Sequence, residues 1–388
     1  MLAIIAPGQG SQTPGMFNSW VTNPVFHELL SQWSMRIDLD LIGLGTKADA
    51  DEIKDTANAQ PLIVAASLLG AHALGIKNCA YTSGHSVGEL AAAAISGAIS
   101  DEDALRLVRV RGLEMAKAAA LSPAGMSAVL GGNREVVLKK LEELKLVAAN
   151  DNGGGQIVAA GDLASLAALS ENPPEGARVR VLAVAGAFHT PFMASAVEPL
   201  RALAATISTA PTTISVISNK DGEVVTDGAQ VLTRIVNQIA NPVRWDLCMQ
   251  TMLDLGVTGL IELPPAGTLV GLAKRAMPGV ECVSLKTPED MPTALDLIAR
   301  HGTETAVTDS PTWRLVVAPF KGIIEFNVSE EPGTVLDGKT KVATIRTLRD
   351  EYEVEAPHGG TIVEWLVTDG DPVNPGQPLL RLHPKAGS

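Results

Sequence analysis

Hydrophobic and polar positions in residues 1–300 follow blocks that are typical of an α/β protein. Short apolar runs at 2–6, 214–218 and 259–263 predict buried strands, because a strand covered on both faces has no polar side. The more polar stretch up to about Asn58 predicts loops and short helices. Strands that alternate with helices predict a mainly parallel sheet covered on both faces. Longer alanine- and leucine-rich runs predict the helices, at 60–74, 101–120, 195–205, 231–240 and 269–277.

The pattern changes between residues 122 and 185, where shorter apolar runs follow one another closely. Their order is β-α-β-β-α-β, which predicts a ferredoxin-like subdomain inserted into a larger domain of residues 1–121 and 186–300. The strands are expected at 126–130, 147–150, 156–160 and 179–184, and the helices at 134–144 and 163–169.

A polar stretch at 301–312 predicts a linker, and residues 313–388 then change to short strands and turns. This last part contains an internal repeat, in which Ala318-Pro319 recurs as Ala356-Pro357, followed in each copy by a glycine and a later valine. Two copies of one strand-and-turn unit predict a small all-β sandwich with pseudo-two-fold symmetry.

Charge and cysteine content exclude several classes of function. The 388 residues carry a formal net charge of -13, so we expect no nucleic-acid partner and no binding to anionic membranes. Cys79, Cys248 and Cys282 lack C-x-x-C spacing, which predicts neither a disulfide framework nor a metal site. The apolar start reads as a strand rather than a signal peptide, and no apolar run is long enough to span a membrane. We therefore predict a soluble, cytoplasmic protein.

The segment Gly84-His85-Ser86-Val87-Gly88-Glu89 carries the clearest chemical signal. Small residues on both sides of a serine allow a strand to turn sharply into a helix and leave the hydroxyl exposed at the tip. The helix is expected to begin at Ser86, so that its free N–H groups and positive dipole end face an oxyanion formed there. The alternative from this motif alone is an ordinary glycine-rich turn with an inert serine.

Other residues favour a nucleophilic serine. His189, predicted at the end of a strand, could take the proton of Ser86, because a serine hydroxyl is too weakly acidic to react unaided. No aspartate stands near His189 in sequence, so a neutral acceptor such as a backbone carbonyl is expected to orient its ring. Arg111 lies on the face of its predicted helix that the apolar residues mark as buried. A buried arginine beside an acyl-serine indicates a substrate that carries its own carboxylate. The alternatives are that His189 is a loop histidine with ordinary structural hydrogen bonds and that Arg111 is solvated at the surface.

Five short motifs, which fall in order with fitting separations, resemble the malonyl-CoA:acyl carrier protein transacylases of fatty-acid and polyketide synthesis over about residues 1–300. The resemblance implies an α/β-hydrolase-like domain with a ferredoxin-like insert and the site in the cleft between them. The motifs are Pro7-Gly8-Gln9-Gly10-Ser11-Gln12, Gly84-His85-Ser86-Val87-Gly88-Glu89, Arg111-Gly112, Ala187-Phe188-His189 and Asn241-Pro242-Val243-Arg244-Trp245.

The resemblance also implies roles for individual residues. Ser86 would be the nucleophile, His189 the general base and Arg111 the residue that binds the free malonyl carboxylate. The backbone N–H groups of Gln9 and Val87 would form the oxyanion hole.

Three further positions follow from the same resemblance. Gln238 matches the residue whose carbonyl orients the histidine, and Asn152 lies where relatives place a site-lining asparagine. Phe188 resembles the malonyl-selective pattern, in which a bulky ring crowds out an extra methyl group. One methyl changes such discrimination by only about 1–3 kcal/mol, so this predicts a preference.

Residues 313–388 resemble biotinyl/lipoyl carrier domains through the segments 355–363 and 370–377. In that family the modified lysine lies in a hairpin, where this chain has Leu348-Arg349-Asp350. Arginine cannot form the amide, so we expect neither biotin nor lipoate, nor any other covalently bound cofactor. A structural or docking module is the favoured interpretation.

The sequence therefore predicts a ping-pong malonyl transfer from malonyl-CoA through Ser86 to the phosphopantetheine thiol of an acyl carrier protein. One alternative is an esterase or thioesterase built on the same elbow, for which Arg111 has no obvious use. The other is a scaffold in which the β module recruits a partner enzyme and catalysis is secondary.

Overall fold

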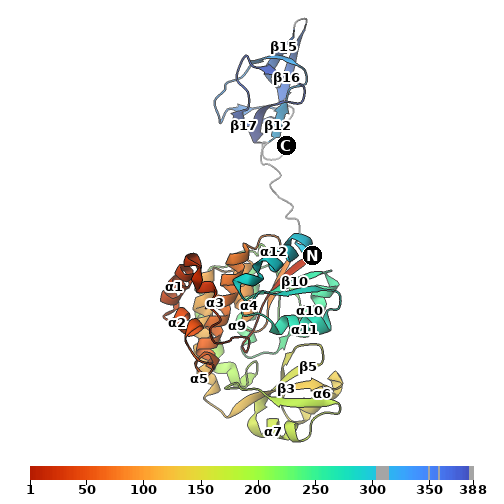
Figure 1. Cartoon of the computed structure of the whole chain (residues 1–388). Helices are drawn as coiled ribbons and strands as arrows, with labels where there is room; N and C mark the ends of the chain where they lie inside the picture. The colour runs from red at the N-terminus through yellow and green to blue at the C-terminus, as the bar shows by residue number, and fades with distance from the viewer. Residues whose placement is uncertain (303–313, 348–349, 357–358, 384–388) are drawn as a thin grey trace. The chain divides into compact units, whose positions relative to one another are not determined.

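The computed structural model describes residues 1–302, 314–347, 350–356 and 359–383. Contacts divide the chain into two compact units, Met1–Thr303 and Glu304–Ser388, and each is described by itself (Figure 1). The first unit is α/β and contains two sheets. The described part of the second unit is all-β, and its strands form two sheets.

The main sheet of the first unit has six strands in the order β11-β10-β1-β2-β7-β8. The first five run parallel, and β8 pairs antiparallel with β7 at one edge. Every residue of β1 is buried, as its uninterrupted apolar sequence predicted. The bounds are β1 Leu2–Ala6, β2 Tyr81–Gly84, β7 Ser215–Ile217, β8 Val224–Val225, β10 Gly259–Glu262 and β11 Glu281–Ser284.

Helix α3, Thr56–Leu74, lies in the core of the first unit and packs against α4 and α5. It is long and apolar enough to cross a membrane, but most of it is buried inside the protein, as in the core helix of a globular domain. The other helices of this part are α1 Pro24–Ile37, α2 Leu41–Thr46, α4 Gly88–Ile95, α5 Asp101–Ala119, α8 Ala194–Ala204, α9 Gly228–Gln238, α10 Trp245–Asp254, α11 Thr268–Ala276 and α12 Met291–His301, with short 3-10 turns at Trp20–Thr22, Glu52–Lys54, Pro191–Met193 and Pro288–Asp290.

The prediction of only loops and short helices before Asn58 was wrong for α1, which has 14 residues. Asn23 caps its first turn by accepting the Val25 N–H, and Pro24 occupies its first position. Both are helix-start signals. They outweigh the polar residues on the solvent side of this helix, which buries only Leu30, Trp33 and Ile37.

The second sheet of the first unit contains the predicted β-α-β-β-α-β order. Its strands lie in the order β6-β3-β5-β4-β9. The last strand, β9 (Val243–Arg244), comes from outside residues 122–185 and pairs parallel with β4. This pairing joins the small sheet to the rest of the unit. The bounds are β3 Ala124–Gly131, α6 Arg134–Glu143, β4 Val147–Asp151, β5 Gln156–Asp162, α7 Leu163–Glu171 and β6 Ala177–Val181.

The described part of the second unit has two four-stranded sheets, β12-β19-β17-β14 and β16-β15-β13-β18, in which neighbouring strands run antiparallel. Side chains from both sheets, such as Ile345 and Leu380, share one hydrophobic core. Leu348 and Arg349, where a modified lysine would stand in a carrier domain, lie outside the described residues. The bounds are β12 Arg314–Val317, β13 Gly322–Phe326, β14 Val335–Leu336, β15 Thr340–Arg346, β16 Glu351–Ala356, β17 Gly360–Trp365, β18 Pro372–Val373 and β19 Pro378–His383.

Candidate active site

Ser86 lies at a sharp turn between β2 and α4, with φ of 54°. A Cβ atom on Gly84 would come within 2.0 Å of the Gly88 carbonyl carbon, and one on Gly88 within 2.3 Å of the Ala6 oxygen. The turn therefore requires glycine on both sides of the serine, as in a nucleophile elbow. Helix α4 begins at Gly88 rather than at Ser86, which corrects the predicted start because the serine itself has left-handed backbone geometry.

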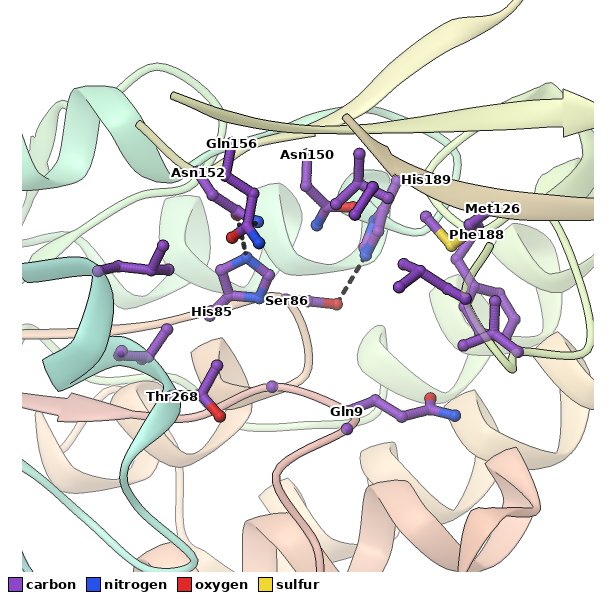
Figure 2. Close-up of a pocket in the computed structure, with 18 of the residues that line it drawn as sticks. Gln9, His85, Ser86, Met126, Asn150, Asn152, Gln156, Phe188, His189 and Thr268 are labelled. Atoms are coloured by element: carbon purple, nitrogen blue, oxygen red, sulfur yellow. Dashed lines mark hydrogen bonds between the residues drawn. The ribbon is translucent and has the colours of Figure 1, made fainter. Parts of the chain in front are cut away.

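His189 lies beside the serine hydroxyl. The Ser86 Oγ is 2.7 Å from His189 Nε2 (Figure 2). On the other side of the ring, His189 Nδ1 donates to the backbone carbonyl of Gln238 at 2.9 Å. Because Nδ1 carries the proton, Nε2 has a free lone pair that accepts the Oγ–H. The expected backbone carbonyl thus takes the place of an aspartate.

The position of His189 differs from the prediction. It lies in a turn with φ of 61°, several residues beyond the end of β6, and not at the end of a strand. Its side chain is buried, and burial together with the nearby Arg111 charge lowers the pKa of His189 to about 3. The ring is therefore neutral, as a proton acceptor must be.

Arg111 reaches the same point from α5 and is only 1% exposed. Its Nη1 donates to the Gln60 side-chain oxygen at 2.6 Å, and its Nη2 donates to the Gln238 side-chain oxygen at 3.0 Å and to Ser86 Oγ at 3.3 Å. The Nε is buried without a hydrogen-bond partner among the described residues. Burial lowers the pKa of Arg111 to about 10, so the group is still a cation at neutral pH.

No ion pair in the described part of the chain includes Arg111. Its guanidinium is held by two neutral amide oxygens, its Nη2 contacts Ser86 Oγ, and its Nε has no partner among the described residues. A buried cation in this state favours an anionic ligand, and the planar guanidinium suits a carboxylate.

Gln9 and Val87 are the two residues predicted to supply the oxyanion hole. Within the described residues, neither backbone N–H has a hydrogen-bond partner in the protein. Gln9 lines the cleft in the turn after β1, and Val87 directly follows Ser86. Two free N–H groups near a nucleophile can together stabilise an oxyanion.

The serine opens into a cleft of about 260 Å³ between the main sheet and the small sheet. Phe188 and Met126 form one apolar wall together with Leu182 and Val184, and Figure 2 shows Phe188 and Met126 side by side. Phe188 is 5% exposed and therefore has little freedom to move away from a bound acyl group. The opposite wall includes Thr268 and other residues of α11.

Asn152 also lines the cleft, but it meets the serine turn through another residue. Its Oδ1 accepts from His85 Nε2 at 2.8 Å, and its Nδ2 donates to the Gln156 side chain at 3.2 Å (Figure 2). Burial lowers the pKa of His85, so this ring is neutral. His85 belongs to the serine motif, but it was given no role from the sequence alone. Its place next to the nucleophile could have marked it as a site residue.

Sequence reasoning missed three further polar residues around the serine. Asn219 accepts the Ser86 N–H at 2.8 Å, and Glu89 accepts the Asn219 N–H at 2.7 Å. Gln60 holds Arg111, as described above. Asn219 directly follows a predicted strand and Glu89 lies in the first helical turn after the nucleophile, positions that often carry functional side chains in α/β proteins.

Five of the eight residues predicted for the site line this cleft: Gln9, Ser86, Asn152, Phe188 and His189. Arg111 and Gln238 are hydrogen-bonded to Ser86, and Val87 follows it in the chain. In the described part of the chain, no group of three or more histidine, cysteine or acidic side chains is arranged to hold a metal ion.

Comparisons with known proteins match the first unit. The family model for the acyl transferase domain covers residues 4–290. The malonyl CoA-acyl carrier protein transacylase of Mycobacterium tuberculosis is 52% identical over 297 residues, which are 75% of this chain and 98% of that protein. The Escherichia coli protein of the same name is 31% identical over 305 residues, covering 76% of this chain and 99% of its own length.

Solved structures agree. The crystal structure of MCAT from Mycobacterium tuberculosis has a TM-score of 0.74 and 51% identity, covering 76% of this chain and 99% of its own. The malonyl-transacylase PlMCAT, in the structure of its complex with the type II PKS acyl carrier protein AntF, has a TM-score of 0.71 and 28% identity, covering 76% of this chain and 99% of its own. The second unit lies outside the matched family model.

Proposed function

The chain belongs to the acyl transferase family. We propose a mechanism by which it acts as a malonyl-CoA:acyl carrier protein transacylase. The enzyme transfers a malonyl group from CoA to an acyl carrier protein, as its relatives are named for doing. One observation supports this substrate most strongly. Arg111 is a buried cation, held by two neutral amides, with Nη2 3.3 Å from the nucleophilic oxygen.

In the first half-reaction, Ser86 Oγ attacks the thioester carbonyl of malonyl-CoA while His189 Nε2 takes the hydroxyl proton. The negative charge that develops on the carbonyl oxygen is stabilised by the N–H groups of Gln9 and Val87. The carbon–sulfur bond then breaks, the CoA sulfur receives the proton from His189, and malonyl-Ser86 forms.

The second half-reaction runs the same steps in reverse order. The phosphopantetheine thiol of the carrier protein gives its proton to His189 and attacks the ester carbonyl. The bond to Oγ breaks, Ser86 recovers its proton, and the malonyl thioester leaves on the carrier.

We assign Arg111 to the free carboxylate of the malonyl group in both half-reactions. A bidentate ion pair there would fix the acyl group relative to Ser86 and His189. Phe188 would close the site beside the carbon between the two carbonyls, which favours malonyl over methylmalonyl. Asn152 would act through His85, whose ring it orients.

The test is the intact mass of the protein after brief mixing with malonyl-CoA, without carrier protein, beside Ser86→Ala. A malonyl adduct on the wild type that is absent from Ser86→Ala is expected. Steady release of CoA without an adduct would favour a thioesterase. Neither adduct nor CoA release would favour the scaffold interpretation.

For the second unit we propose a biotinyl/lipoyl-like fold that carries no covalent cofactor and serves in docking. Two antiparallel sheets around one core and the repeat of Ala318-Pro319 as Ala356-Pro357 support the fold, and Arg349 supports the missing modification. Deletion of residues 313–388 is expected to leave malonyl transfer unchanged and to abolish binding to a partner enzyme. Mass of the intact chain isolated from its own cells would reveal biotin or lipoate if this proposal were wrong.

We also propose a cytoplasmic location and a role in fatty-acid or polyketide synthesis. The burial of α3 inside the first unit supports the location. The names of the relatives support the use of a carrier protein, which both kinds of synthesis require.

A further inference from the structure

Glu89 is a buried carboxyl group that the proposed chemistry does not use. It lies in the first turn of α4, three residues after the nucleophile, and is 2% exposed. It is not among the residues that line the cleft. One carboxyl oxygen accepts the Asn219 backbone N–H at 2.7 Å, and the other accepts the Gln238 side-chain N–H at 2.5 Å. Both oxygens therefore act as acceptors for groups that themselves touch the site. Burial raises the pKa of Glu89 to about 8, whereas the Asn219 N–H and the nearby Arg111 charge favour the ionised form, which accepts on both oxygens.

The side-chain amide of Gln238 has only one orientation that fits its neighbours. Its Nε2 faces three acceptors, the Glu89 carboxyl, Asn219 Oδ1 at 3.1 Å and the Ser86 carbonyl at 3.2 Å. Its Oε1 faces Arg111 Nη2 at 3.0 Å. Because an amide nitrogen only donates and an amide oxygen only accepts, turning the group over would place donors against donors and acceptors against acceptors.

This orientation decides how Arg111 is held. The oxygen of Gln238 fixes Nη2 beside Ser86 Oγ, and the Gln60 oxygen fixes Nη1. A carboxylate in direct contact would compensate the buried charge more strongly, but it would also occupy the donors that a substrate carboxylate needs. The amide of Gln238 lies between the carboxyl group of Glu89 and the guanidinium, with one hydrogen bond to each.

We propose that Glu89 is a positioning residue for substrate selection. By fixing the amide of Gln238, it holds Arg111 beside Ser86 and leaves the guanidinium open to the carboxylate of the incoming acyl group. Glu89 thereby sets the preference for dicarboxylic acyl groups over simple ones such as acetyl. This inference rests on the proposed malonyl transfer and goes beyond it.

The main test is Glu89→Gln in the full chain. A glutamine of nearly the same shape must turn its own NH2 group toward either the Asn219 N–H or the Gln238 NH2, so one donor meets a donor. The Gln238 amide is then expected to turn or shift, and Arg111 to lose its place. The readout is the rate of acylation of Ser86 by malonyl-CoA and, separately, by acetyl-CoA, followed by intact mass.

We expect Glu89→Gln to slow malonyl acylation about ten- to hundredfold, as for a misplaced binding group. Acetyl acylation makes no use of Arg111 and is expected to change less than about threefold, so the malonyl-to-acetyl ratio falls. Glu89→Asp keeps both acceptors with a shorter reach and should recover part of that ratio. Ser67→Ala is the matched control, because it removes a buried hydrogen bond of 2.8 Å to Pro264 in the same unit, outside the cleft.

A folded Glu89→Gln protein with the wild-type malonyl-to-acetyl ratio would overturn the proposal. An equal loss with both substrates, matched by Ser67→Ala, would also overturn it, since that indicates a purely structural role.

If Glu89→Gln does not fold, Gln238→Glu tests the same point. A carboxylate at 238 would pair directly with Arg111, and the malonyl-to-acetyl ratio should again fall. An unchanged ratio there would contradict the proposal. Failure of the wild type itself to form malonyl-Ser86 would instead refute the proposed function, so the two failures are distinguishable.

Discussion

The two units of this chain treat buried polar groups differently. In the first unit, buried polar and charged side chains gather around Ser86, including Glu89, Arg111, His189 and Gln238. In the described part of the second unit, the buried side chains are hydrophobic, and the ion pairs that the structure contains lie at partly exposed positions, such as Lys341 with Glu353. A buried polar group without partners costs roughly 1–3 kcal/mol, so hydrogen bonds among the members of such a cluster are needed to stabilise it.

The difference shows how each unit is stabilised and what it can do. The first unit spends stability on a polar network whose members hold one another in a single arrangement, which is the condition for chemistry. The second unit has a core of side chains such as Ile345 and Leu380, which provide stability without reactivity. Surface ion pairs add little, because water already solvates both charges.

Removal of the general base is expected to have the largest effect, because it takes the chemistry out of the first unit while its fold remains. His189→Ala is expected to slow acylation of Ser86 by about a hundredfold to ten-thousandfold, the usual contribution of a positioned general base. Rapid-quench mixing with malonyl-CoA and intact mass measures this rate. Unfolding of the second unit should be unaffected, and a rate within a few-fold of wild type would contradict the assignment of His189.

A core substitution in the second unit tests the other side. Ile345 is fully buried, so Ile345→Ala should lower the free energy of unfolding of that unit by about 2–5 kcal/mol through lost contacts and a cavity. Hydrogen exchange of peptides from residues 314–383 measures this change, and acylation of Ser86 should stay at the wild-type rate. Ile345→Val, which removes one methylene, should cost only about 0.5–1.5 kcal/mol. A parallel loss of acylation would show that the units depend on each other.

Substitution of Phe188 tests substrate selection within the cleft. Phe188→Ala should raise acylation by methylmalonyl-CoA relative to malonyl-CoA, by an amount worth about 1–3 kcal/mol for one methyl group. Competition between the two thioesters, read by adduct mass, gives the ratio. Phe192→Ala is the matched control, since Phe192 is nearby in sequence but 39% exposed and outside the cleft. Equal ratios in both variants would exclude Phe188 as the selective residue.

The smallest expected effect is that of moderate acid on the acylation rate. The pKa of His189 is lowered to about 3, so the ring is neutral in the folded protein throughout the range in which an ordinary histidine gains its proton. Single-turnover acylation should therefore show no inflection near 6.5 that belongs to His189. An inflection there that disappears in His189→Ala would contradict the lowered pKa.

The same shift has a consequence for stability. Below about 6.5 the unfolded chain binds a proton at His189 that the folded chain does not, so the free energy of unfolding should fall as the pH drops from 6.5 toward 3. His189→Gln, which does not titrate, should lose less stability over that range. Chemical denaturation at several pH values measures both.

Local sequence was enough for much of the fold. The β-α-β-β-α-β order, the buried strand β1 and the elbow around Ser86 follow from short-range patterns of apolar residues and glycines. Strand β9 could not be predicted, because two residues carry no period and its pairing with β4 depends on distant chain. Helix α1 was missed although Asn23 and Pro24 mark its start.

The candidate site divides in the same way. Ser86, His189 and Arg111 could be named because each residue type has a defined chemical use and stands in a recognisable motif. Glu89 and Asn219 were not named, because each acts through a contact with a distant part of the chain. Glu89 accepts from Gln238, and Asn219 accepts from Ser86.

The kinds of elements, the nucleophile and the need for an anionic substrate group could all be predicted from the sequence alone. These depend on turn geometry, hydrophobic period and the intrinsic chemistry of single residues. The folded structure was needed to show that Arg111 is held by amides rather than by a carboxylate, and that Glu89 accepts from Gln238 behind it. A hydrogen bond requires the right direction and a distance correct to within a few tenths of an ångström. Remote segments reach this geometry only once the chain has folded.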